Sequence, residues 1–146
     1  MAKQIKAYFI LPFYPEEATK AVFKETDSYD LRGELDNWLP AAFANKLGQY
    51  VDPEDREKLI LFLKDFDELI EVMSPPYFLN KIEYTITSEE FSDKYSMKYI
   101  RQELFDLFLS VATYEGPIEV DKGNVGEYYI YFSTLAECAL LLNKKD

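Results

Sequence analysis

Residues 52–73, DPEDREKLILFLKDFDELIEVM, carry the strongest fold signal in the chain. Asp52 at the N-cap, Pro53 at the first helical position and acidic residues in the first turn are typical of a helix start. Apolar side chains then recur at helical spacing, which predicts an amphipathic helix with one face against the core. The apolar stripe consists of Leu59, Phe62, Leu63, Phe66, Leu69, Ile70 and Met73.

The opposite face of this predicted helix is acidic, with apolar residues among the carboxylates. Between Asp52 and Glu71 there are eight acidic and three basic residues, a local charge of −5. Carboxylates about one helical turn apart can engage a basic groove on another protein and speed its association. The alternative is an ordinary solvated helix face. The candidate partner-binding residues on this face are Glu54, Glu57, Leu61, Asp65, Glu68 and Glu71.

Capping signals and apolar spacing predict further helices on both sides of this stretch. We expect helices over 15–24, over 31–47 with a kink or break at Pro40, and over 96–114. Thr87 with Glu90, and Thr134 with Glu137, have the spacing of a capping box. Each pair therefore predicts the start of a short helix.

Alternating and aromatic stretches predict the strands. Residues 5–11 are nearly continuous in apolarity, and residues 81–87 alternate with a period of two. Residues 118–121 and 127–132 flank a glycine-bearing loop at 122–126, which is typical of a hairpin. The predicted fold class is therefore α+β: a single compact domain over 1–146, with about four mostly antiparallel strands and four to six helices packed mainly on one face.

Tyrosine is abundant, with twelve residues in the chain. It is enriched at protein interfaces because it combines an apolar ring with a polar tip. On the predicted strand over 127–132, Tyr129 and Tyr131 lie opposite the core-facing set. These two residues are added to the candidate contact surface.

Composition excludes several kinds of chemistry. Histidine is absent and cysteine occurs once, at Cys138, so histidine-dependent catalysis and a Cys/His zinc site within one chain are excluded. Cys138 lies among apolar residues and is expected to be a small buried side chain. No glycine pattern that cradles phosphates is present. We predict no catalytic residue, no metal site and no cofactor.

Net charge and hydropathy indicate which partners and which cellular compartment to expect. A formal charge of −11 disfavours direct nucleic-acid binding, which depends on lysine and arginine at phosphates. No stretch approaches the roughly 20 uncharged apolar residues of a membrane span, and the N-terminus does not have the pattern of a signal peptide. With one cysteine, these features predict a cytoplasmic protein without membrane contact.

These observations favour a non-enzymatic acidic binding protein that blocks the basic functional surface of a nuclease, a toxin or a nucleic-acid-guided effector. Immunity proteins and phage-encoded inhibitors of restriction or CRISPR systems follow this physical strategy. The main alternative is a small-ligand-binding regulatory or accessory domain. A carboxylate enzyme, and a homodimer or assembly formed through exposed aromatic residues, are left open.

Overall fold

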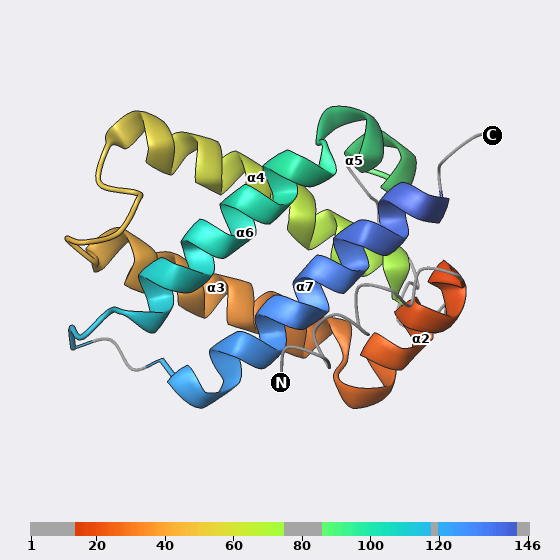
Figure 1. Cartoon of the computed structure of the whole chain (residues 1–146), viewed down its shortest axis with the longest axis horizontal. Coiled ribbons are helices and arrows are strands. Elements are labelled where there is room, and N and C mark those ends of the chain that lie inside the picture. The colour runs from red at the N-terminus through yellow and green to blue at the C-terminus, as the bar shows by residue number, and fades with distance from the viewer. Residues whose placement is uncertain (1–13, 75–85, 118–119, 143–146) are drawn as a thin grey trace.

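The computed structural model describes residues 14–74, 86–117 and 120–142 (Figure 1). This part of the chain is 80% helical and contains no strand. The predicted α+β fold class is therefore wrong for the described residues. The helices are α2 (Pro15–Glu25), α3 (Ser28–Ala44), α4 (Pro53–Met73), α5 (Ser88–Lys94), α6 (Met97–Ala112) and α7 (Lys122–Leu142).

Local capping determines where several of these helices begin. The Thr87 hydroxyl accepts a hydrogen bond from the Glu90 backbone N–H at 3.2 Å, so this predicted cap is confirmed. The Asp27 carboxylate caps α3, and the Ser96 hydroxyl caps α6, in the same way. Helix α4 begins at Pro53, as its sequence predicts. The side-chain acceptors of Asp27, Thr87 and Ser96 satisfy backbone N–H groups that have no partner within the helix, whereas the Asp52 side chain makes no such bond at the start of α4.

The loop and the second strand of the predicted hairpin, residues 122–132, instead form the first half of α7. The Asp121 carboxylate accepts a hydrogen bond from the Gly123 N–H at 3.1 Å, and helix α7 begins at Lys122. Thr134, predicted to cap a terminal helix, instead lies in the middle of α7. Its hydroxyl donates to the Ile130 carbonyl of the preceding turn at 2.8 Å.

Helix α7 has the sequence pattern of a strand, and its middle is buried on all sides, because every residue from Tyr131 to Ala136 is buried. Helix α7 packs against α2, α3, α4, α5 and α6, so it has no continuous polar face. A helix that is apolar all round lacks the 3.6-residue periodicity by which a surface helix is recognised. Aromatic residues at Tyr128, Tyr129, Tyr131 and Phe132 then favour a strand by propensity alone, and tertiary packing overrides that preference.

The other predicted strands lie wholly or mostly outside the described residues. This applies to 5–11 and to 81–85. Ile86 and Thr87, at the end of the second predicted strand, precede α5 without belonging to a strand. Val120 and Asp121, at the end of the first hairpin strand, are likewise not in a strand.

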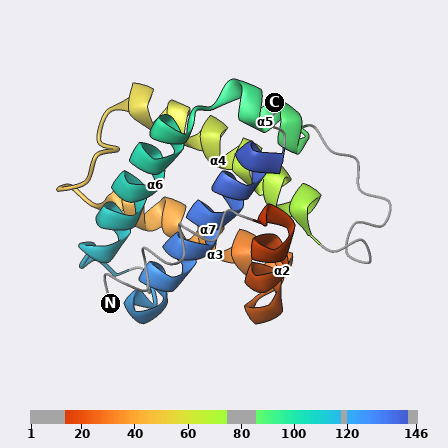
Figure 2. The ribbon, with the colours of Figure 1, turned by 45° about the vertical axis from the view of Figure 1, so that its right-hand side comes forward.

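Helices α6 and α7 run side by side and cross in front of α3 and α4 (Figure 1). Helix α2 packs along α7, and the short α5 bridges α4 and α7 (Figures 1 and 2). This arrangement makes α7 the central helix and leaves one side of α4 facing outward. Within the described segments, no helix combines the length and the apolarity needed to cross a membrane.

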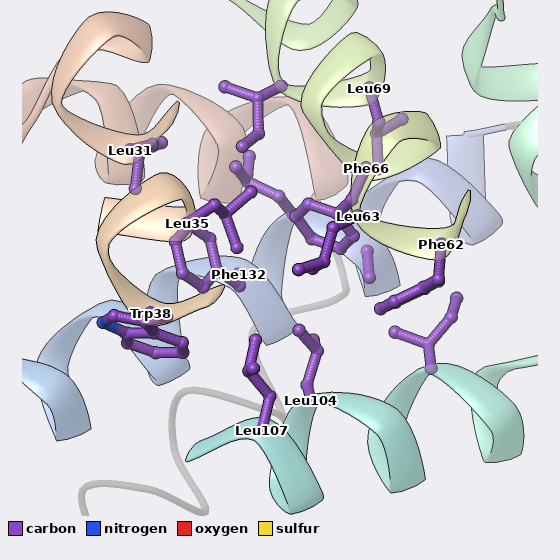
Figure 3. Packing of buried hydrophobic residues seen from close by; sticks show 14 of the residues in the cluster. Leu31, Leu35, Trp38, Phe62, Leu63, Phe66, Leu69, Leu104, Leu107 and Phe132 are labelled. Atoms are coloured by element: carbon purple, nitrogen blue, oxygen red, sulfur yellow. The ribbon is translucent and has the colours of Figure 1, made fainter. Parts of the chain in front are cut away.

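The core lies where α3, α4, α6 and α7 meet (Figure 3). The Phe132 ring makes edge-to-face contacts with Trp38, at a centroid distance of 5.3 Å, and with Phe66, at 5.7 Å. All three side chains are fully buried. The predicted apolar stripe of α4 faces this core, because its residues from Leu59 to Ile70 are buried and Met73 packs against them.

The sequence predicts a kink or a break at Pro40. Pro40 lies inside α3, which continues to Ala44, so the helix does not break there. Proline has no N–H to bond the carbonyl four residues earlier, and its ring crowds that carbonyl. We expect Pro40→Ala to raise the free energy of unfolding by about 1–2 kcal/mol. This value is a net one, because alanine improves the helix but also gives the unfolded chain more conformational freedom than proline does. Urea titration followed by circular dichroism measures this change.

Asn37→Ala is the matched control, because Asn37 is an exposed, non-proline position one turn earlier in the same helix. This substitution should raise the free energy of unfolding by only roughly 0.5 kcal/mol, the difference in helix propensity between asparagine and alanine. Equal gains from the two substitutions would contradict the assignment of a backbone cost to Pro40.

Candidate protein-binding face

The outward side of α4 presents carboxylates and apolar side chains to solvent. Glu54 and Glu57 are exposed, and neither forms an ion pair with a described residue. Ile60 and Leu61, in the next turn, are 44% and 53% exposed. Three of the six predicted α4 residues, Glu54, Glu57 and Leu61, therefore lie together on the surface. We call Glu54, Glu57, Ile60 and Leu61 the α4 face.

Asp65 lies at the edge of the α4 face and already has partners within the protein. Its carboxylate accepts a hydrogen bond from the Tyr95 hydroxyl at 2.6 Å and forms an ion pair with Lys94 at 2.5 Å. Burial raises the pKa of Tyr95, and the bond to Asp65 raises it further. Asp65 thus fastens α4 to α5, and its side chain is only 17% exposed.

Glu71 does not lie on the outer surface, so its predicted placement there is corrected. Its side chain is 6% exposed and pairs with Arg32 of α3, with 3.1 Å between Oε2 and Nη1. The same guanidinium donates to Asp67 at 2.7 Å. Glu68 is half-buried and adds to the negative potential at Arg32. The C-terminal part of the predicted acidic row, Glu68 and Glu71, therefore faces Arg32 at the contact between α3 and α4.

A shallow groove between α3 and α4 extends the α4 face. Its volume is about 290 Å³. Ile60 belongs to both the groove and the α4 face, so the two surfaces are continuous. The residues lining the groove are Leu35, Asp36, Leu39, Ile60, Leu63, Lys64 and Asp67.

Carboxylates from α6 approach the first turn of α4 on its other side. Burial raises the pKa of Glu103, and the nearby Asp106 and Asp55 carboxylates raise it further. The Tyr50 hydroxyl donates to Glu103 at 3.1 Å and opposes this shift. Lys58 lies close enough to Glu103 to lower its pKa as well. Sequence reasoning missed Glu103 and Asp106 because they lie about 50 residues after the first turn of α4 in the chain.

The two predicted tyrosines do not join the α4 face. Tyr129 lies on α7 and packs its ring against Phe108 and Phe105 of α6, with centroid distances of 5.2 and 6.4 Å. Tyr131 is 7% exposed, and its hydroxyl donates to Glu127 at 2.8 Å. Their predicted placement on the outer side of a strand is wrong, because both are helical and Tyr131 is buried.

The described part of the chain contains no group of three or more carboxylate or cysteine side chains placed to hold a metal ion. Cys138 is buried, as predicted, and burial raises the pKa of its thiol.

An open cavity of about 680 Å³ adjoins Glu34, Glu115 and Asp121. Burial raises the pKa of Glu34, and the nearby Asp121 raises it further.

Comparison with protein-family models, with curated proteins and with solved structures gives no match. The functional argument therefore rests on the exposure, charge and contacts of the residues described above.

Proposed function

We propose that this protein is a non-enzymatic binding protein whose α4 face docks onto the basic functional surface of another protein. The observation that carries the proposal is the α4 face itself. It combines exposed Ile60 and Leu61 with Glu54 and Glu57, two carboxylates without an ion pair to any described side chain. The apolar contact area contributes to affinity, and the carboxylates without an ion pair speed association with a basic partner.

The partner class follows from charge. A chain of net charge −11 repels nucleic acid and attracts proteins whose own surfaces bind phosphates. A nuclease, a toxin or a nucleic-acid-guided effector fits this description. We place the encounter in the cytoplasm, where a lone buried thiol such as Cys138 stays reduced.

The proposal predicts that charge reversal on the α4 face weakens binding to the partner. The probes are purified basic nucleases and nucleic-acid-guided effectors, tested by surface binding and by inhibition of nucleic-acid cleavage. Glu54→Lys with Glu57→Lys should weaken any interaction found at least about ten-fold, because two attractive charges become repulsive. Affinity of the unaltered protein should fall as salt rises.

The matched control is Glu25→Lys with Glu115→Lys, which makes the same charge change at exposed positions outside α4. It should alter affinity by less than about two-fold at moderate salt. Leu61→Ser should weaken binding with little change in salt dependence, since it removes apolar area. Equal losses from both charge-reversed pairs, or no binding by the probe panel at low salt, would refute the proposal.

A second function, binding of a small ligand, is favoured by one observation. A mainly apolar pocket lies beside α2, away from the α4 face.

A further inference from the structure

A pocket of about 500 Å³ lies between α2 and the C-terminal ends of α4 and α7. This volume falls within the usual range of small-molecule sites, roughly 300–1,000 Å³. Its apolar lining comes from Phe23, Val72, Met73 and Leu142. Phe23 and Met73 also pack against the core cluster, which holds these two side chains in place. The pocket therefore offers a preformed apolar wall.

Two lysines of α2 border the same pocket. Lys20 and Lys24 are one helical turn apart, and both line it. The Lys20 ammonium lies 4.0 Å from the Glu17 carboxylate in a highly exposed pair, which contributes little. Lys24 forms no ion pair with a residue in the described segments.

Charge selects among the ligands that an apolar pocket of this size would accept. One acidic residue, Glu16, also lines the pocket, one turn before Lys20, so the lining carries two lysines and one acid. Glu17, which does not line the pocket, pairs with Lys20, and Lys24 is the lining lysine left without an ion pair among the described residues. An apolar body with one negative group would use both the wall and the lysines, whereas a cationic amphiphile would be repelled.

We propose that this pocket binds an apolar carboxylate, such as the anion of a medium-chain fatty acid. The hydrocarbon tail lies against Phe23, Val72, Met73 and Leu142. The carboxylate lies between the Lys20 and Lys24 ammonium groups. This site is separate from the α4 face, and either can exist without the other.

Titration of the ¹⁵N-labelled full chain with decanoate, followed by amide chemical shifts, tests the site and its position. Decanol and decyltrimethylammonium are the matched ligands, because they carry the same tail with a neutral or a positive head group. Decanoate should shift the amides of α2 and of the last turns of α4 and α7. It should bind at least about five-fold more tightly than either comparison ligand.

Lys20→Glu with Lys24→Glu should weaken decanoate binding at least about five-fold. Lys46→Glu with Lys98→Glu is the control, since it makes the same charge change at exposed lysines that do not line the pocket. Circular dichroism checks that both variants stay folded. Equal binding of the three ligands, equal losses in the two variants, shifts spread over all helices, or no decanoate binding would each overturn the proposal.

Discussion

Phe66→Ala is expected to lower the free energy of unfolding by about 3–5 kcal/mol, the largest effect of any substitution considered. The Phe66 side chain is fully buried in α4. Its ring contacts those of Phe62, Phe91 and Phe132, with centroid distances of 5.6 to 5.8 Å (Figure 3). Alanine removes these contacts and leaves a cavity where three helices join, which cannot collapse without moving one of them.

Urea unfolding followed by circular dichroism measures this loss. Since domains are stable by only about 5–15 kcal/mol, this loss removes a large fraction of the total stability. Phe105→Ala is the control, because Phe105 is 47% exposed and lies on the outer side of α6. It should cost roughly 1 kcal/mol or less. Similar losses from the two substitutions would mean that Phe66 is not part of a rigid core.

Arg32→Met is expected to lower the free energy of unfolding by about 2–3 kcal/mol, the second largest effect. Removal of the guanidinium leaves the Glu71 carboxylate, only 6% exposed, without its cationic partner. Breaking a fully buried pair costs about 3–5 kcal/mol, and the value is reduced here because Arg32 and Asp67 are 41% and 32% exposed. Methionine keeps much of the apolar stem, so the loss reports on charge.

A double-mutant cycle separates this interaction from general damage. Glu71→Leu in the Arg32→Met background should recover at least half of the loss, because the buried charge is then absent. Lys20→Met serves as the control, since its pair with Glu17 is about three-quarters exposed on both sides. It should change stability by less than about 0.5 kcal/mol. Failure of the second substitution to recover stability would exclude an unpaired Glu71 as the cause.

The candidate face could be predicted from the sequence only in part. Helical spacing placed Glu54, Glu57 and Leu61 opposite the core, and these three residues are exposed on α4. The same spacing could not show that Arg32 would bury Glu71, or that Lys94 and Tyr95 would hold Asp65. Those partners come from other helices, so their positions depend on how the helices pack.

Local signals allowed the sequence by itself to determine α4, its start at Pro53, its buried stripe and the Thr87 cap. These features depend on residues within one or two turns of each other, where backbone geometry alone sets which side chains meet. Composition likewise determined the absence of histidine chemistry and the strong negative charge.

Only the tertiary structure decided that residues 122–142 form the helix α7, and which carboxylates remain on the surface. The aromatic residues of α7 favour a strand in isolation, but packing against five other helices, with Tyr131 to Ala136 buried, stabilises the helical conformation. The exposure of an acidic side chain depends in the same way on cations that lie far away in the chain. Both outcomes rest on long-range contacts, which no local pattern encodes.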